Sequence, residues 1–243
     1  MKIPRVIHQV WEGKRESTLP TRLQILSDSW KEKNPTWEYR LWHEKDMNEL
    51  VEKHFPFFKS IYNNFKYDVQ RWDTIRYMIL YVYGGVYTDL DTECYKSIDD
   101  LLVNRNICIG LEPNEHVLPG YPSPLIGNAF LCSSPSQPFW LEVLDLIQNN
   151  LKTKNRISDK GQYVMYTTGP LMISEAVCTS KYQQLITLLL SKDVAPISKF
   201  DLEKYISDKS NDFQIRIDNS YCAHYFFGSW EKKFSIYNTY DYV

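Results

Sequence analysis

The sequence predicts an α/β protein with a mainly parallel sheet flanked by helices, and two observations favour this fold class. Segments with the residue pattern of a strand and segments with the spacing of a helix follow one another without a linker, low-complexity tract or internal repeat. Such alternation indicates a sheet covered by helices. In addition, two aspartates, Asp89 and Asp91, follow a short apolar run, and sheets of this kind bind their ligands at the carboxyl ends of strands.

The first half of the chain alternates strand-like and helix-like segments. Residues 6–11 are rich in strand formers, and residues 37–42 alternate large apolar with polar side chains, as a strand does. Leu23, Leu26 and Trp30 have helical spacing. The predicted elements are, in order, a strand at Val6–Trp11, a helix at Pro20–Trp30, a strand at Trp37–Trp42, helical stretches around Met47–Phe65 and Tyr67–Tyr83, and the strand that carries Val86 and Tyr87.

The second half predicts further strands at Ile107–Leu111 and Ala129–Cys132 and helices at Pro138–Ile147 and Pro170–Val177. Because no composition shift interrupts the chain, we expect one continuous domain over residues 1–243.

The composition is typical of a soluble globular protein, with 43% hydrophobic and 24% charged residues. A net charge of −2 lacks the basic footprint of nucleic-acid binding, so we expect no nucleic-acid partner. The five cysteines are widely spaced and form no CxxC pair, which favours reduced thiols. The N-terminus lacks the apolar stretch of a signal peptide, and no run approaches the ~20 apolar residues of a membrane span. We therefore expect a cytoplasmic location.

The most informative motif is Asp89-Leu90-Asp91. Residues i and i+2 of a strand point to the same side, so two carboxylates at this spacing are expected to converge near the end of the strand. Mg²⁺ and Mn²⁺ take oxygen ligands, often from only one or two protein carboxylates, and leave other positions to water and substrate phosphates. The motif therefore predicts a site for a metal ion and a diphosphate.

Asp73 and Arg76 precede this motif on a predicted helix, where residues three apart share a face. They form either an ordinary surface ion pair, worth at most about 1 kcal/mol, or a pair held close to the metal. Gly84-Gly85, a plausible C-terminal cap, leads directly from the helix into the Asp-x-Asp strand. We therefore expect the pair to lie near the metal.

Taken in their order along the chain, these motifs resemble glycosyltransferase family 32, the sugar transferases with a DxD motif. The resemblance rests on the segment 3–11, on Asp73-x-x-Arg76 and on residues 84–91. The family includes yeast initiating mannosyltransferases and many bacterial capsule and O-antigen enzymes, and it is related to the glucosylating domains of large clostridial toxins. Two later pieces also fit, Asn128-Ala129 with Ser134-x-x-x-Pro138-Phe139, and His224 with Gly228-Ser229-Trp230. Between residues 152 and 220 only Thr168-Gly169-Pro170 matches.

This resemblance implies a GT-A fold and a metal-dependent, retaining transfer of a hexose from a nucleotide-diphosphate sugar, with Mn²⁺ or Mg²⁺ as cofactor. A UDP-hexose such as UDP-galactose is the favoured donor, and GDP-mannose is the alternative. The implied acceptor is an oligosaccharide or a lipid-linked glycan, in capsular or O-antigen polysaccharide synthesis, with peripheral contact at the inner face of the membrane. The resemblance also implies a front-face mechanism, and no residue stands out as the carboxylate nucleophile that a double displacement would need.

The resemblance also implies roles for single residues. The catalytic group consists of Asp89, Asp91 and Arg76, and the metal ligands are Asp91, Asp89 and His224. The donor-binding residues are Gln9, Trp11, Asp73, Arg76, Tyr87 and Asp89, together with Ser229 and Trp230 in a flap at about residues 221–233. Trp11 would stack on the base, unless it is an ordinary core tryptophan. Glu112 and Asn128 are candidates for contacts with the acceptor.

Two alternatives remain at this point. Asp89-Leu90-Asp91-Thr92 partly resembles the nucleophile motif of haloacid-dehalogenase-type phosphatases, in which Asp89 would attack phosphorus. That interpretation leaves Trp11, Asp73 and Arg76 unexplained. The second alternative is a non-catalytic carbohydrate-binding protein, which the 18 Tyr, 11 Phe and 7 Trp residues would suit.

Overall fold

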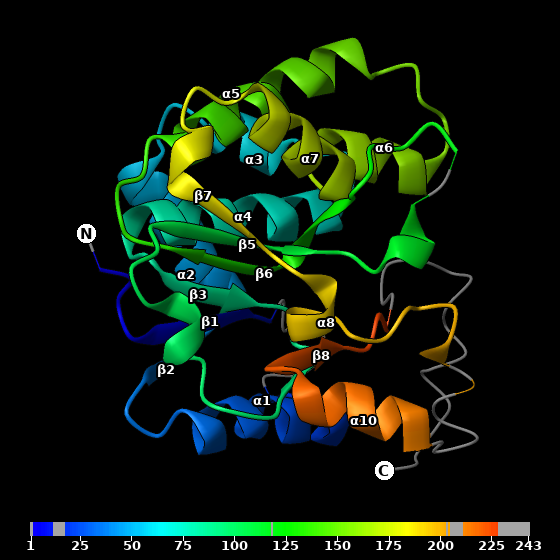
Figure 1. Ribbon diagram of the computed structural model, residues 1–243. Helices are drawn as coiled ribbons and strands as arrows, with labels where there is room; N and C mark the ends of the chain where they lie inside the picture. Colours follow the sequence, from blue (N-terminus) through cyan, green and yellow to red (C-terminus); the bar gives the residue numbers. More distant parts are fainter. Residues whose placement is uncertain (1, 12–17, 118, 203, 205–210, 228–243) are drawn as a thin grey trace.

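The computed structural model describes residues 2–11, 18–117, 119–202, 204 and 211–227. They form a fold with a six-stranded sheet at its centre (Figure 1). Its strand order is β2-β1-β3-β6-β5-β7. The strands are β1 (Val6–Val10), β2 (Glu38–Trp42), β3 (Gly85–Thr88), β5 (Ile107–Leu111), β6 (Ile126–Ser133) and β7 (Ile186–Leu189). β1 runs parallel to β2 and β3, and β5 runs parallel to β7, whereas β6 is antiparallel to both of its neighbours. The predicted α/β class is confirmed, with a mixed sheet.

Helices cover both faces of this sheet (Figure 1). One hydrophobic core joins the sheet to α2, α3, α4, α5 and α7, and a second core joins it to α1, α8 and the strands β4 and β8. Ile107 and Ile109 of β5 belong to the first core and Cys108 to the second, as expected for a strand buried on both faces. The described helices are α1 (Thr21–Lys33), α2 (Glu44–His54), α3 (Lys59–Asn63), α4 (Asp68–Val82), α5 (Phe139–Thr153), α6 (Lys160–Thr167), α7 (Pro170–Thr179), α8 (Ser191–Val194) and α10 (Asn211–Asn219).

The helical stretch predicted around Met47–Phe65 consists of two helices. It forms α2 and α3, which are separated by residues 55–58. Pro56 lies in this break, and proline disfavours a helical residue before it and cannot donate a backbone hydrogen bond. The prediction missed α6, α8, α10, β7, and a two-stranded antiparallel sheet of β4 (Thr92–Cys94) and β8 (Cys222–His224). Among the described helices, none combines the length and apolar character needed to span a bilayer.

The two glycines between α4 and β3 allow the chain to turn sharply. Gly84 and Gly85 have φ angles of +65° and +90°, in the left-handed region that glycine adopts without strain. A Cβ atom on Gly85 would lie 2.5 Å from the carbonyl oxygen of Val6, so a side chain there would push β1 away. The turn thus lets β3 pair closely with β1 and directs the chain toward Asp89.

Candidate active site

The Asp-x-Asp motif forms a turn between strands of two different sheets. β3 ends at Thr88, and β4 begins at Thr92. The carbonyl of Asp89 accepts hydrogen bonds from Thr92 Oγ1 at 2.6 Å, from the Thr92 amide at 3.2 Å and from Gln9 Nε2 at 3.0 Å. The expectation that strand geometry aligns the two carboxylates was therefore wrong. A turn held by Thr92 and Gln9 positions Asp89 and Asp91.

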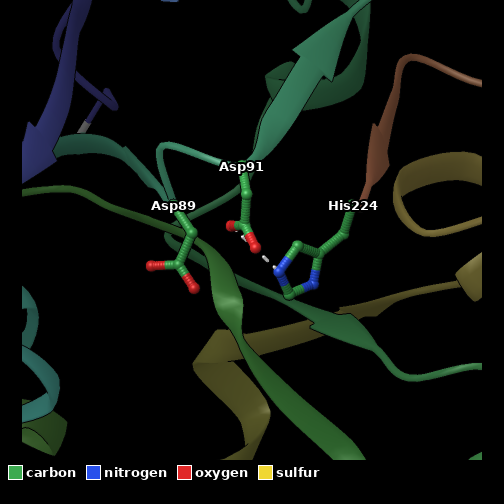
Figure 2. Close-up of side chains that lie close together, drawn as sticks. All are labelled: Asp89, Asp91 and His224. Carbon is green, nitrogen blue, oxygen red and sulfur yellow. Dashed lines mark ion pairs between the residues drawn. The ribbon is translucent and has the colours of Figure 1, made fainter. Parts of the chain in front are cut away.

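The pairing of β4 with β8 brings His224 to this turn (Figure 2). Thr92 lies opposite His224 in the antiparallel register, and His224 Nε2 is 3.2 Å from Asp91 Oδ1. The backbone amide of Phe227 donates to Asp91 Oδ2 at 2.8 Å. Asp89, Asp91 and His224 each offer one ligand atom, and these atoms lie within 4.8 Å of one another. The three predicted metal ligands are thus brought together.

The electrostatics of this cluster favour positive charge. Burial alone would lower the pKa of His224, but Asp91, followed by Asp89 and Glu112, raises it to about 9. Burial would raise the pKa of Asp91, yet the charge of His224 and hydrogen bonds from His224 and Phe227 bring it below its ordinary value. For Asp89, burial dominates and raises the pKa, while Arg76 opposes it. A pKa of about 9 corresponds to a protonated imidazole at neutral pH, paired with Asp91, which lies between His224 and Asp89 in Figure 2.

This donor set fits a divalent cation. Carboxylate oxygens are the preferred ligands of Mg²⁺ and Mn²⁺, and a neutral imidazole can add a nitrogen ligand for a Mn²⁺-like ion. Within the described part of the chain, Asp89, Asp91 and His224 form the one group of three such side chains with this spacing. The chemistry of the residues thus agrees with a metal centre, whereas the identity of the ion stays a prediction.

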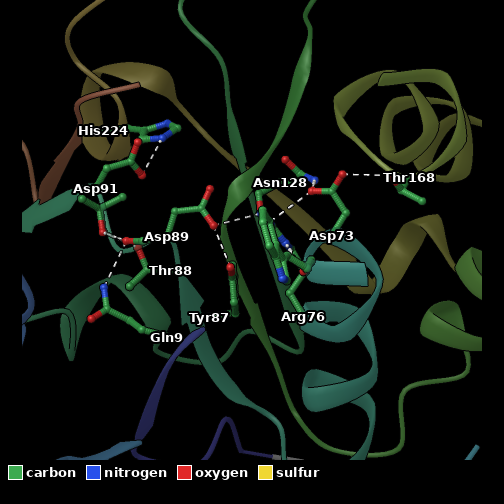
Figure 3. A network of polar contacts seen from close by, with 12 residues as sticks. Gln9, Asp73, Arg76, Tyr87, Thr88, Asp89, Asp91, Asn128, Thr168 and His224 are labelled. Carbon is green, nitrogen blue, oxygen red and sulfur yellow. Dashed lines mark hydrogen bonds and ion pairs between the residues drawn. The ribbon is translucent and has the colours of Figure 1, made fainter. Parts of the chain in front are cut away.

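Beside the cluster lies a buried ion-pair network on α4 (Figure 3). Arg76 Nη2 is 3.0 Å from Asp73 Oδ1, and Arg76 Nη1 is 3.0 Å from Asp89 Oδ1. Arg76 Nη1 also donates to the carbonyl of Asn128 at 2.7 Å, and the Tyr87 hydroxyl donates to Asp89 Oδ1 at 2.7 Å. The side chains of Asp73 and Arg76 are only 7% and 6% exposed. They are not the surface pair that the sequence left open.

Charge on this network is maintained by its own partners. Burial raises the pKa of Asp73, and Arg76, Thr168 and Asn128 oppose that effect. Burial would lower the pKa of Arg76, but Asp89, Tyr87 and Asp73 raise it above its ordinary value. Removing one partner of such a buried pair strands the other, which costs about 3–5 kcal/mol. The network therefore acts as one unit that ends on Asp89.

The other predicted donor-binding residues have different positions. Gln9 is fully buried, and its amide oxygen accepts from the Tyr39 hydroxyl at 2.6 Å while its Nε2 donates to Asp89. In this structure Gln9 supports the turn through the Asp89 carbonyl, and its contact with a donor stays a prediction. Trp11 is half-buried directly after β1, and its contact with a base stays a prediction. Ser229 and Trp230 lie outside the described residues.

Of the two residues predicted to contact the acceptor, Asn128 lies on the Asp73 side of the site and Glu112 on the His224 side. Asn128 Nδ2 donates to Asp73 Oδ1 at 3.0 Å. Glu112 Oε2 is 2.8 Å from His116 Nδ1. A cavity of about 10 Å³, enough for about one water molecule, is lined by Glu112 and His224 among other residues. Their contact with an acceptor stays a prediction.

Sequence reasoning assigned no role to several residues that hold this site. Thr168 donates to Asp73, Thr92 closes the Asp-x-Asp turn, and the backbone amide of Lys199 donates to His116 Nε2 at 2.9 Å. The last contact leaves the proton of a neutral His116 on Nδ1, where it faces Glu112. For Thr168, the segment Thr168-Gly169-Pro170 was the sequence signal, because a glycine followed by a proline indicates the start of a helix at this point.

Comparison with known proteins agrees with this geometry. Residues 20–107 match the model of the glycosyltransferase sugar-binding region containing a DXD motif. The chain is 31% identical over 180 residues, 73% of its length, to inositol phosphoceramide mannosyltransferase 1 of Schizosaccharomyces pombe, and this match covers 52% of that protein. It is 30% identical over 44% of its length to the initiation-specific alpha-1,6-mannosyltransferase of Candida albicans, covering 29% of that protein. The chain spans about half the length of the first of these relatives.

Solved structures show the same fold at low sequence identity. The PaToxG glycosyltransferase superimposes with a TM-score of 0.55 at 17% identity, over 89% of this chain and 77% of that one. The galactosyltransferase LgtC, solved with donor and acceptor sugar analogs, gives a TM-score of 0.52 at 9% identity, over 98% and 97% of the two chains. These similarities show a GT-A fold.

Proposed function

We propose that this chain, a member of the glycosyltransferase family with a DXD-containing sugar-binding region, transfers mannose from a nucleoside diphosphate mannose to a hydroxyl group of a lipid-linked acceptor. The observation that carries this proposal is that two clusters of charged side chains share Asp89. On one side Asp89 meets Asp91 and His224, and on the other it meets Arg76 and Asp73. A diphosphate held at the first group would present its sugar to the second.

Asp91, Asp89 and His224 would hold the divalent cation. When bound, the cation supplies positive charge to the diphosphate that leaves the sugar. Because metal ligation requires a neutral imidazole, His224 would release the proton that it shares with Asp91 to solvent before it could serve as a ligand. The Phe227 amide then keeps Asp91 Oδ2 in place.

Other residues of the chain would orient the donor sugar. Asp73 and Arg76 are aligned by each other and by the carbonyl of Asn128, so they can receive sugar hydroxyls without rearranging. In a retaining front-face transfer, the bond from the anomeric carbon to the phosphate oxygen breaks while a bond to the acceptor oxygen forms on the same face. The acceptor proton then passes to the leaving phosphate.

Mannose is the proposed sugar because relatives at 30–31% identity are named mannosyltransferases. This choice places GDP-mannose ahead of the UDP-hexose that the sequence favoured. The buried Asp73–Arg76 network suits any hexose, since it offers both an acceptor and donors to hydroxyl groups. Donor identity is therefore decided by experiment.

The acceptor follows from the same relatives, several of which are named for inositol phosphoceramide or mannosyl phosphorylinositol ceramide. We propose a hydroxyl-rich headgroup on a lipid as the acceptor class, in place of the capsular or O-antigen polysaccharide expected from the sequence. Glu112, at the end of β5, is proposed to orient this hydroxyl. A cytoplasmic location and peripheral contact with a membrane are proposals that rest on the sequence.

Calorimetric titration with UDP, GDP, UDP-galactose and GDP-mannose tests this function. Each nucleotide is added with Mn²⁺ and with chelator to wild type and to Asp91→Asn, which preserves the size of the side chain. We expect binding of GDP-mannose that needs Mn²⁺ and is lost in Asp91→Asn. Metal-dependent binding of UDP-galactose alone would overturn the choice of mannose, and binding of none of the four would overturn the proposal.

Two outcomes would favour the alternative interpretations. Release of phosphate from p-nitrophenyl phosphate would favour a phosphatase, although Asp89 Oδ1 is already engaged by Arg76 and Tyr87. Glycan binding that persists in Asp91→Asn and in chelator would favour a carbohydrate-binding protein. Incubation of the wild type with GDP-mannose, Mn²⁺ and phosphatidylinositol vesicles, followed by mass spectrometry of the lipids, then tests transfer directly.

A further inference from the structure

Residues on one face of α4 form hydrogen bonds with the corner between α6 and α7, at Thr167 and Thr168. Gln70 Nε2 donates to Thr167 Oγ1 at 2.8 Å, and the Tyr77 hydroxyl donates to the Thr168 carbonyl at 2.7 Å. Between these contacts, Thr168 Oγ1 donates to Asp73 Oδ2 at 2.9 Å (Figure 3). Gln70, Asp73 and Tyr77 are spaced three and four residues apart, so they share this face of the helix. The corner is thus bonded to Asp73, the carboxylate that is proposed to bind the donor sugar.

Both oxygens of Asp73 already have partners in this structure. A carboxylate has about four lone-pair positions that can accept hydrogen bonds. Asn128 Nδ2 donates to Oδ1 at 3.0 Å and Thr168 Oγ1 donates to Oδ2 at 2.9 Å, while Arg76 Nη2 forms an ion pair with Oδ1 at 3.0 Å. Among the described residues, Oδ1 thus has two neighbours, a guanidinium and an amide, whereas Oδ2 accepts from Thr168 alone and has about one acceptor position left.

The hydroxyl of Thr168 also determines how Asp73 is oriented. Arg76 and Asn128 both contact Oδ1, and within the described part of the chain Thr168 is the hydrogen-bond donor to Oδ2. Thr168 Oγ1 is closer to Asp73 Oδ2, at 2.9 Å, than to the carbonyl of Val164, at 3.4 Å. The Tyr77 contact fixes the Thr168 backbone and therefore the direction from which its hydroxyl approaches.

We propose that Thr168 is a positioning residue for donor-sugar recognition, which fixes Asp73 so that its remaining acceptor position on Oδ2 takes a single hydroxyl of the sugar. This inference rests on the proposed function, because it assigns the ligand of Asp73 to the sugar of the donor. It adds a residue from a different part of the chain to the site. It also predicts that one sugar hydroxyl dominates the contact with Asp73.

Adjacent threonines provide a matched control. Thr167 and Thr168 are both fully buried at the same corner, and both hydroxyls are hydrogen-bonded. Thr167 Oγ1 donates to the Tyr163 carbonyl at 2.7 Å and accepts from Gln70 Nε2 at 2.8 Å, whereas Thr168 Oγ1 donates to Asp73. Thr167→Val and Thr168→Val remove the same group from the same kind of environment. A purely structural role would make their effects on donor binding alike.

The test is calorimetry with GDP and with GDP-mannose, each with Mn²⁺, on wild type, Thr167→Val, Thr168→Val and Thr168→Ser. Because the lost hydrogen bond goes to a charged group, Thr168→Val is expected to weaken GDP-mannose binding about 10-fold and leave GDP binding unchanged. Thr168→Ser, which restores the hydroxyl, should recover most of the affinity, and Thr167→Val should bind both ligands as wild type does. Equal losses in the two valine variants, or a loss of GDP binding in Thr168→Val, would overturn the proposal.

Analogues of GDP-mannose that lack one hydroxyl at a time test the single contact. In wild type one position should matter most, and its removal should cost less in Thr168→Val because Asp73 is then less well placed. Similar penalties at two or more positions would contradict the assignment. If Thr168→Val does not fold, as judged by circular dichroism, Thr168→Ala and Thr168→Cys are compared with Thr168→Ser in the same titrations.

Failure of this inference is distinguishable from failure of the proposed function. If wild type binds neither GDP-mannose nor UDP-galactose with Mn²⁺, the proposed function is wrong and the role of Thr168 falls with it. If UDP-galactose is the ligand, the same variants are compared with UDP and UDP-galactose. If a donor binds and Thr168→Val retains its wild-type preference for nucleotide sugar over nucleotide, only the role of Thr168 is wrong.

Discussion

Acid should destabilise this protein through one buried histidine, His8, which links β1 to the turn before the active site. His8 is 1% exposed, and its Nδ1 accepts a hydrogen bond from Trp42 Nε1 at 3.1 Å. Its Nε2 lies 3.0 Å from the Gly84 carbonyl, to which it donates because Nδ1 is the acceptor. Both ring nitrogens are therefore engaged in the neutral form. Burial, reinforced by Arg40, lowers the pKa of His8 to about 4 although the Gly84 carbonyl opposes this shift.

The size and sign of the effect follow from linkage. The pKa of His8 is about 4 in the folded protein and 6.5 for an ordinary histidine, so the unfolded chain binds the proton more tightly. At about 1.4 kcal/mol per pKa unit, the neutral ring is worth about 3 kcal/mol of folding free energy. This stability is fully present above pH 6.5 and is lost as the pH falls toward 4. By pH 5 the loss should reach about 2 kcal/mol.

The assay is urea unfolding followed by tryptophan fluorescence between pH 8 and pH 4.5, on wild type and His8→Gln. Glutamine can accept from Trp42 and donate to Gly84, but it does not titrate. Other groups change protonation equally in both proteins, so the difference in unfolding free energy isolates His8. We expect a constant difference above pH 7 and a loss of about 2 kcal/mol specific to wild type by pH 5. Parallel curves over the whole range would refute the reasoning.

Three further changes address the active site. Arg76→Lys keeps the charge but loses the forked guanidinium that contacts both Asp73 and Asp89, so turnover with GDP-mannose should fall about 100-fold. Turnover near that of wild type would contradict the role of Arg76 in linking these two carboxylates. Glu112→Gln should lower transfer to the acceptor without changing the affinity for GDP-mannose, and near-wild-type turnover would rule out a role for this carboxylate. Gln9→Ala removes a donor to the Asp89 carbonyl and should weaken Mn²⁺-dependent GDP binding about 10-fold, whereas an unchanged dissociation constant would show that Thr92 alone holds the turn.

The parts of the fold that depend on local sequence were predictable. α4 and the glycine turn follow from helical spacing and from two adjacent glycines, and the structure ends α4 at Val82 with both glycines in the left-handed region. Asp73 and Arg76 were expected near the Asp-x-Asp motif, and both are part of one network with Asp89. Each of these features depends on residues within about one helix and one strand of one another.

The parts that depend on long-range pairing were not predictable from patterns. His224 reaches Asp91 because β8 pairs with β4, and each of these strands has only three residues. A run this short carries no readable alternation, so the resemblance and not the periodicity suggested His224. The contact that Gln9 makes with the turn was not predictable for a related reason. Its pattern marks a strand residue, but only the neighbouring strands show that its amide meets Asp89 and Tyr39.

The arrangement of charge explains why these distant segments have to meet. Three carboxylates, those of Asp73, Asp89 and Asp91, lie around one guanidinium and one imidazole. When the carboxylates are ionised, negative charge is therefore in excess even if His224 is protonated. Burying such a group is costly unless its charges are paired and its oxygens receive hydrogen bonds. Thr168 and the Phe227 amide, from two separate parts of the chain, supply such hydrogen bonds. The remaining deficit of positive charge is what a divalent cation would fill, and the site is therefore expected to bind the metal before or together with the nucleotide.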